Sequence, residues 1–267
     1  MNANTQAVAA EPLVLRQDAA GVVTLTLNRP AQFNSLSQAL MSALQTELDV
    51  IAADSGVRVV ILAGAGKAFC SGHDLKEMRS NPSKTFQKAL FQQCSKLMLA
   101  LVRMPQPVIA RVHGIATAAG CQLVSMCDLA VASDNSRFAV SGVNLGLFCA
   151  TPSVGLARNL GRKQAMEMLL TGEFIDAQAA LARGLVNRVV PLAQLDEEIG
   201  KLTDSIVSKT PVAIKAGKQM FYRQLELGLD EAYELASETM ACNMMAEDAQ
   251  EGIDAFVAKR KPQWKGR

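Results

Sequence analysis

The sequence predicts an α/β protein whose C-terminal third is helical. Over the first 160 residues, apolar β-branched runs alternate with amphipathic segments, which is the rhythm of a mostly parallel sheet. From residue 192 onward the periodicity is helical almost to the end, with interruptions at Pro211 and Gly228. At 267 residues the chain is also long enough to bury one large core.

The first elements expected are a β-hairpin and a long helix. Residues 12–17 and 21–28 form the hairpin, since the second run alternates apolar and polar residues and stops just before Pro30. The helix covers 37–54, because leucine and isoleucine recur there on one face, and Ser37 is a suitable N-cap.

Three further strands are expected at 57–64, 107–114 and 127–133, where continuous apolar runs are typical of buried parallel strands. A helix over about 83–103 connects the first two with the usual right-handed crossover. Two shorter helices are expected to end at Gly172 and Gly184, and a last short strand covers residues 185–190.

Composition argues against several functional classes. The net charge of +2 does not favour nucleic acid, and no apolar run approaches the 18 residues of a membrane span. Six scattered cysteines without a C-x-x-C pair, and only two histidines, predict no metal site. The cysteines fit reduced thiols, and the first ten residues lack a signal-peptide pattern, so a cytoplasmic location is expected.

Two loops rich in glycine, alanine and serine could carry chemistry. GAGKAFCSGHDLKEM (64–78) and HGIATAAGCQL (113–123) each follow a predicted strand and run into a helix. Helix starts present free N–H groups, and two of them facing one point could hold an oxyanion. Small residues at such junctions also serve close packing, so the residues alone leave both interpretations open. Neither loop has the spacing of a P-loop or a serine nucleophile elbow.

Five segments resemble the enoyl-CoA hydratase/isomerase, or crotonase, family. In order along the chain they are NRPAQFNSLS (28–37), AFCSGHDLKEM (68–78), HGIATAAGCQLVSMCDLAVAS (113–133), AMEMLLTGEFIDAQAALARGLVNRVV (165–190) and AFVAKRKPQW (255–264). ATAAGCQL and GVNLGLFCATP are most similar to the subgroup named after enoyl-CoA hydratase domain-containing protein 3.

The resemblance implies a crotonase-like (ClpP/crotonase) fold. It places a spiral of ββα units at 12–200, after a flexible tail at 1–11, and a helical region at 201–267 that forms homotrimers or dimers of trimers. It also implies an acyl-CoA thioester as substrate. Coenzyme A would then be part of the substrate, and no separate cofactor is expected.

The resemblance implies roles for four residues. The backbone N–H groups of His73 and Ala119 would stabilise a thioester enolate. Lys76 would reach the phosphates of coenzyme A, and Lys259 would approach the adenosine side of a site, often on a neighbouring subunit.

The sequence departs from the family at both catalytic carboxylates. Hydratases of the family carry glutamates where this chain has Gln122 and Gly142. A positioned acid or base contributes about 10²–10⁴ in rate, and an amide cannot take a proton at pH 7. Efficient hydration is therefore not expected, although Gln122 could orient a water.

Several alternatives follow from this departure. The His73 side chain could polarise a substrate, hold a carboxylate or point to solvent, while Cys149 is expected only to pack. Asp74 and Asp128 are expected to be structural. The protein could be a hydratase- or isomerase-like lyase, an acyl-CoA decarboxylase that needs no base, or a non-catalytic acyl-CoA binder.

Overall fold

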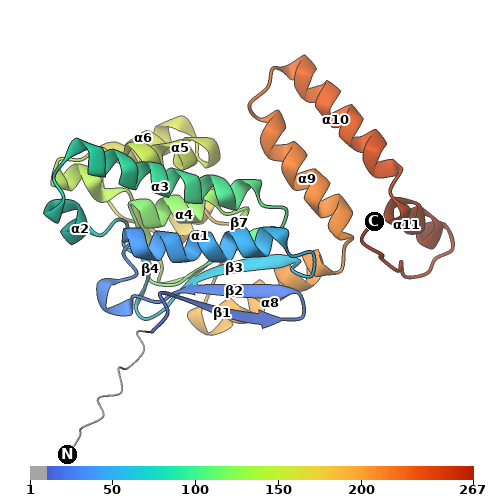
Figure 1. Ribbon diagram of the computed structural model, residues 1–267, viewed down its shortest axis with the longest axis horizontal. Coiled ribbons are helices and arrows are strands. Elements are labelled where there is room, and N and C mark those ends of the chain that lie inside the picture. Colours follow the sequence, from blue (N-terminus) through green and yellow to red (C-terminus); the bar gives the residue numbers. More distant parts are fainter. Residues whose placement is uncertain (1–10) are drawn as a thin grey trace, which may run out of the picture.

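The computed structural model describes residues 11–267, and Figure 1 shows a body of strands and helices with a helical arm beside it. The body is built on a six-stranded sheet in the order β1-β2-β3-β5-β7-β10. Its strands are β1 (Val14–Ala19), β2 (Val22–Leu27), β3 (Val59–Gly64), β5 (Val108–Val112), β7 (Leu129–Ser133) and β10 (Arg188–Val190). β1 and β2 form the predicted hairpin, and all other neighbours are parallel.

A second sheet of four short strands, in the order β4-β6-β8-β9, supports the loops that the sequence singles out. These strands are β4 (Ala68–Cys70), β6 (Ile115–Thr117), β8 (Arg137–Ala139) and β9 (Ile175–Asp176). The prediction of one strand over 107–114 is wrong at its end, because Gly114 adopts a φ of 65° and turns the chain from β5 into β6. Strands of two or three residues are too short to show a period in sequence.

Helices cover both faces of the large sheet (Figure 1). α1 (Gln38–Ala53), α3 (Lys84–Arg103) and α4 (Ala119–Met126) lie on one face, and α8 (Leu195–Val207) packs on the other. The predicted cap of α1 is confirmed, because the Ser37 side chain accepts a hydrogen bond from Leu40 N at 3.2 Å.

The remaining elements of the body are short. Its helices are α2 (Leu75–Ser80), α5 (Ala150–Asn159), α6 (Arg162–Thr171) and α7 (Ala177–Ala182). Its 3₁₀ turns are η1 (Pro30–Gln32), η2 (Ser141–Leu145) and η3 (Leu192–Gln194). α6 ends at the predicted Gly172, whose φ of 64° is the left-handed conformation that favours glycine at a helix end.

The arm consists of α9 (Pro211–Gln224), α10 (Leu229–Met244) and α11 (Glu247–Val257). The predicted breaks at Pro211 and Gly228 are confirmed, as the first residue of α9 and the N-cap of α10. The boundary expected between residues 200 and 201 falls inside α8, which still packs on the sheet. The tail expected at 1–11 lies, except for Glu11, outside the described residues.

A buried cluster of polar groups, which we call the anchor cluster, fastens α9 to the body. Lys218 Nζ donates to Asp128 Oδ2 at 2.6 Å and to the carbonyl oxygens of Leu101 and Gln106 at 2.8 Å each. Tyr222 donates to the other Asp128 oxygen at 2.9 Å. Burial lowers the pKa of Lys218, and the charge of Asp128 partly offsets this. The structural role expected for Asp128 agrees with this geometry.

Within residues 11–267, no helix is both long and apolar enough to cross a bilayer. The same part of the chain brings together no group of three metal-ligating side chains. Its cysteines are all free thiols, and five of the six are buried.

Candidate active site

The segment that begins at Arg29 holds the first glycine-rich loop in place. Asn34 Nδ2 donates to the carbonyl oxygens of Ala65 and Ala68, both at 2.8 Å. Arg29 forms an ion pair with Asp74 at 3.0 Å, and Asp74 also accepts the first free N–H groups of α2. Burial raises the pKa of Asp74, but these partners hold it below its ordinary value overall. Asp74 therefore has the structural role predicted for it, as the N-cap of α2.

The backbone of this loop turns the N–H of His73 away from Leu36. Leu36 N donates to the Gly72 carbonyl at 2.7 Å, and Asp74 N donates to the Leu36 carbonyl at 3.1 Å. Successive N–H groups of an extended chain point in opposite directions, so that of His73 faces away from Leu36. Among the described residues it has no acceptor.

The second loop presents a matching donor at Ala119. Ala118 adopts φ 50° and ψ −120°, conformational angles that a residue with a β-carbon rarely adopts, and Ala119 begins α4. The N–H of the first helical residue has no acceptor within its own helix, and none is found elsewhere in the described chain. A β-carbon on Gly72 would lie 2.8 Å from Ala118 Cβ and 3.3 Å from Ala119 N. Small residues therefore let the two loops approach each other.

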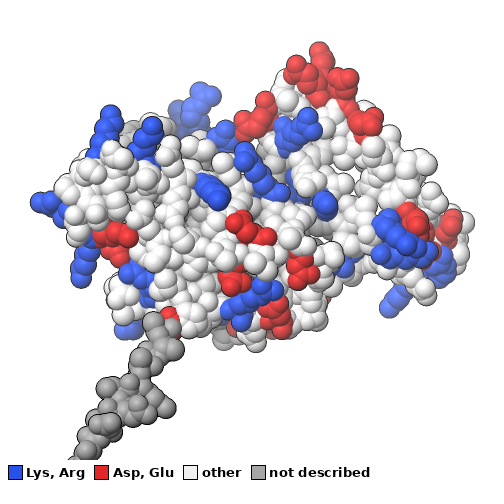
Figure 2. Space-filling model, viewed as in Figure 1, with Lys and Arg blue, Asp and Glu red and all other residues white. Residues whose placement is uncertain are grey.

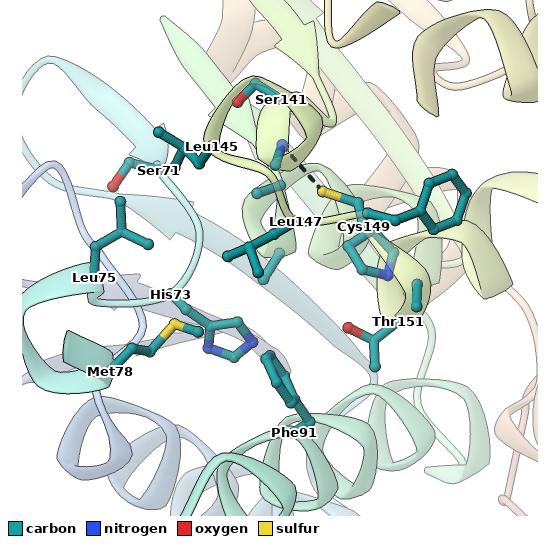
Figure 3. A pocket seen from close by; sticks show the side chains of 16 residues that line it. Ser71, His73, Leu75, Met78, Phe91, Ser141, Leu145, Leu147, Cys149 and Thr151 are labelled. Carbon is teal, nitrogen blue, oxygen red and sulfur yellow. Dashed lines mark hydrogen bonds between the residues drawn. The ribbon is translucent and has the colours of Figure 1, made fainter. Parts of the chain in front are cut away.

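The two loops open into a cavity of about 290 Å³, closed on its other sides by η2, the start of α5, Met78 and Phe91 (Figure 3). Its wall is mostly apolar. Of the described residues that line it, none is an aspartate, glutamate, lysine or arginine. The polar side chains are those of Ser71, His73, Ser141, Cys149 and Thr151. Phe91, Met78 and Thr151 carry no sequence signal that marks them as site residues.

The His73 imidazole lies in the cavity wall and does not point to solvent. Its ring meets Phe91 edge to face, with centroids 5.4 Å apart. Both ring nitrogens are buried, and neither forms a hydrogen bond with any described residue. Burial lowers the pKa of His73 to about 4, although the Leu36 carbonyl nearby opposes the shift. The side chain is therefore neutral at pH 7.

Gly142 lines the cavity, but the space for a side chain on it is filled. Its N–H donates to Cys149 Sγ at 3.3 Å. A β-carbon at this position would lie 2.6 Å from the Leu147 carbonyl oxygen and 2.7 Å from Cys149 Sγ. Burial raises the pKa of Cys149, so its thiol is protonated at pH 7, in keeping with the packing role expected for it.

Gln122 is not among the residues that line the cavity. It lies one turn inside α4, where every residue from 119 to 125 is buried, and it is only 3% exposed. Its Oε1 atom has no hydrogen-bond partner among the described residues. The expectation that Gln122 orients a water at the reacting group therefore has no support in this geometry.

Of the two predicted coenzyme A contacts, the structure brings one to the site. Lys76 borders a shallow, open depression of about 1030 Å³ that continues from the cavity across Leu75, Leu145 and Leu147. Lys259 follows α11, at the far side of the arm from α2 (Figure 1), and borders neither space.

The fold and the paired donors define a crotonase-type protein, and the model of the enoyl-CoA hydratase/isomerase family matches residues 17–267. The chain belongs to this family. A solved enoyl-CoA hydratase from Mycobacterium smegmatis is 58% identical, covers 95% of this chain and 99% of its own, and superposes with a TM-score of 0.94.

The subgroup expected from the sequence is confirmed. Enoyl-CoA hydratase domain-containing protein 3 of Xenopus laevis is 46% identical over 95% of this chain and 86% of its own. The solved human protein of the same name is 46% identical, covers 94% of this chain and all of its own, and has a TM-score of 0.92.

These relatives overturn one expectation. The Xenopus, rat, human, mouse and zebrafish proteins of the subgroup are all named mitochondrial. The cytoplasmic location expected from the cysteines and the first ten residues is therefore wrong as judged from these relatives, since buried free thiols do not distinguish the two compartments.

Proposed function

We propose that the protein binds acyl-CoA thioesters with the acyl group in the cavity and stabilises a thioester enolate. One observation supports this most directly: His73 and Ala119 both line the cavity, and the backbone N–H of neither residue has an acceptor among the described residues. Two backbone donors aimed at a developing oxyanion need no reorganisation, and one such donor contributes about 2.7–4 kcal/mol.

The rest of the thioester would leave the cavity through the depression beside α2. Lys76 and Arg79 border this depression, and neither charge is buried. Figure 2 shows basic side chains at the end of the body where α2 lies. Flexible cations at a cavity mouth suit the phosphates of coenzyme A, which remain partly solvated.

Proton transfer would be slow, because no described carboxylate lines the cavity and His73 is a weak base. Hydration of crotonyl-CoA should therefore fall well below the ordinary enzyme range of about 1–10³ s⁻¹. A turnover number inside that range would contradict the proposal that the site lacks an efficient acid or base.

Mass spectrometry of a diverse acyl-CoA panel would test the function itself. The informative variant is the double change Ala118→Gly and Ala119→Pro, because proline at the first helical position removes the Ala119 donor without breaking α4. Ala118→Gly alone is the matched control, since it makes room for the proline ring and keeps both donors. We expect any turnover to fall at least 100-fold in the double variant only.

The same panel separates the alternatives. Hydration or isomerisation of any thioester supports a family lyase. Loss of CO₂ from a malonyl-type thioester, which yields the enolate without a base, supports a decarboxylase. Saturable binding without any product supports a non-catalytic binder, and no binding at all contradicts the proposal.

We also propose that the arm assembles chains into a homotrimer or a dimer of trimers. Large apolar side chains on α10, on α11 and between them are strongly exposed, among them Leu229 at 74%, Met245 at 76% and Phe256 at 84%. Exposed patches of this kind mark interfaces. Such an assembly could bring Lys259 to a neighbouring site. Analytical ultracentrifugation should give a multiple of three, and a stable monomer at micromolar concentration would refute the assembly.

A further inference from the structure

The Arg29 side chain joins the two chain segments that meet beside His73. Its Nη1 atom donates to the Ser35 carbonyl oxygen at 2.6 Å, and its Nη2 atom donates to Asp74 Oδ2 at 3.0 Å. The Arg29 and Asp74 side chains are only 18% and 15% exposed, so salt screens this ion pair less than an exposed one. The arginine is itself held in place, because its backbone N–H donates to the Asn34 side chain at 2.9 Å.

These contacts lie beside the peptide unit that carries the His73 donor. Leu36 N donates to the Gly72 carbonyl oxygen at 2.7 Å, and Asp74 N donates to the Leu36 carbonyl oxygen at 3.1 Å. The Gly72 carbonyl and the His73 N–H belong to one peptide unit, and in a planar trans peptide these two groups point in opposite directions. The position of Leu36 therefore fixes the direction of the His73 N–H.

We propose that Arg29 is a positioning residue, which holds the His73 N–H in the direction of the thioester oxygen. This inference rests on the proposed function, which places that oxygen at the donor. The residues that Arg29 bridges flank the bonded pair Leu36 and His73, so the guanidinium group spans the same gap as the two backbone hydrogen bonds. Without it, only neutral hydrogen bonds would hold the gap, and each of these contributes about 0.5–1.5 kcal/mol.

The Asp74 carboxylate extends the effect of the ion pair to α2. Its Oδ1 atom accepts the N–H groups of Lys76 and Glu77 at 3.1 and 3.2 Å, while Oδ2 accepts from Arg29. No residue of α2 is buried, so the position of this helix depends largely on polar contacts. Leu75 of α2 lines the cavity, and Lys76 borders the depression. The same carboxylate therefore fixes the donor and the cavity mouth relative to each other.

Acetoacetyl-CoA tests the positioning role, because it has an acidic C–H between two carbonyl groups and its conjugated enolate absorbs in the near ultraviolet. Absorbance against pH gives the pH at which half of the bound thioester is enolate, which we call the enolate midpoint. Hydrogen bonds to the enolate oxygen lower this midpoint relative to that of the free thioester. In the Arg29→Gln variant we expect the midpoint to rise by about one pH unit, because a misdirected donor stabilises the enolate less.

Butyryl-CoA measures binding without enolate formation. Isothermal titration calorimetry should give the Arg29→Gln variant an affinity for butyryl-CoA within about twofold of the natural protein, because a neutral carbonyl oxygen gains little from one donor. A purely structural role for Arg29 would instead weaken the binding of both thioesters. The two readouts together therefore separate positioning of the donor from general disruption of the site.

Three further variants complete the test. Arg29→Lys keeps the charge but lacks the fork that reaches both acceptors, so it should reverse only part of the rise in the midpoint. Asp74→Asn keeps a suitable N-cap for α2 and removes the ion pair, so it should raise the midpoint as Arg29→Gln does. Arg16→Gln is the matched control, since Arg16 pairs with Asp18, does not line the cavity and should leave the midpoint unchanged.

An unchanged midpoint in Arg29→Gln would overturn the inference and leave the proposed function intact. A raised midpoint with an equal loss of butyryl-CoA affinity would also overturn it and would assign Arg29 a general structural role. If Arg29→Gln does not fold, Asp74→Asn decides by the same two readouts. A natural protein that binds neither thioester, or leaves the midpoint of acetoacetyl-CoA at its free value, would refute the proposed function and the inference with it.

Discussion

The anchor cluster and the cavity both contain buried polar side chains, but these side chains differ in whether they have hydrogen-bond partners. In the anchor cluster, Lys218 and Asp128 are surrounded by partners and every donor of the ammonium group is used. In the cavity, both nitrogens of His73 and the N–H of Ala119 have no partner among the described residues. Paired groups stabilise the fold, whereas unpaired buried groups cost stability.

The difference separates two kinds of charged or polar residue that look alike in a sequence. Asp128 and Asp74 each accept several hydrogen bonds from the protein and act structurally. His73 lies next to Asp74 and has no such partners. The number of hydrogen-bond partners that a buried polar side chain has therefore cannot be inferred from its residue type or from its neighbours in the sequence.

Removing the cation of the anchor cluster should have the largest effect on stability. Lys218→Met leaves the Asp128 carboxylate buried without its counter-charge, and we expect a loss of about 3–5 kcal/mol in the free energy of unfolding. Urea unfolding would measure it. The control is Lys201→Met, since Lys201 is exposed and its ion pairs with Glu197 and Glu198 should contribute less than about 1 kcal/mol. Equal losses of stability in the two variants would show that the buried ion pair contributes no more than the exposed one.

The His73→Leu variant, in contrast, should not lose stability. At pH 8 we expect unchanged or slightly higher stability, because an unpaired buried polar group is replaced by an apolar one. The pKa of His73 falls to about 4 on folding, so between pH 6.5 and 4 the unfolded chain binds a proton that the folded chain does not.

As the pH decreases from 6.5 to 4, the free energy of unfolding of the natural protein should therefore fall by roughly 2–3 kcal/mol more than that of the His73→Leu variant. Urea unfolding of both proteins at several pH values would measure the difference. Parallel curves would show that the imidazole is paired or solvated in solution.

The smallest expected effect on stability concerns Ala118, whose backbone conformation orients the N–H of Ala119. Ala118→Gly should raise the free energy of unfolding by up to about 1 kcal/mol, because glycine adopts the observed φ of 50° and ψ of −120° more readily. Ala116→Gly in β6 is the control, and should lower stability by about 1 kcal/mol. Thermal unfolding would compare them. A loss in Ala118→Gly equal to that in the control would show that the conformation is unstrained.

The large elements of the fold were predictable from the sequence, and the second sheet was not. The helix from Ser37 and the strands β1, β2, β3, β5 and β7 of the large sheet have enough residues to show a period and an end signal. β4, β6, β8 and β9 have two or three residues each, so their pairing depends on contacts between distant segments.

The candidate site was predictable only in part. The positions of His73 and Ala119 followed from a resemblance, because a backbone N–H carries no residue signature. The same resemblance suggested a role at the reacting group for Gln122, which the structure buries outside the cavity wall. The unpaired state of the His73 ring depends on what surrounds it in three dimensions, so no pattern in the chain could have predicted it.

The packing around Gly142 limits how this site could change in evolution. Any side chain at that position meets the Leu147 carbonyl and the sulfur of Cys149, so a single mutation that introduces a carboxylate there also disturbs the turn. Replacement of Cys149 by a smaller residue removes only one of the two obstacles. A descendant of this protein would therefore need permissive mutations in residues 147–149 first, and each of these would be retained only if it were neutral on its own.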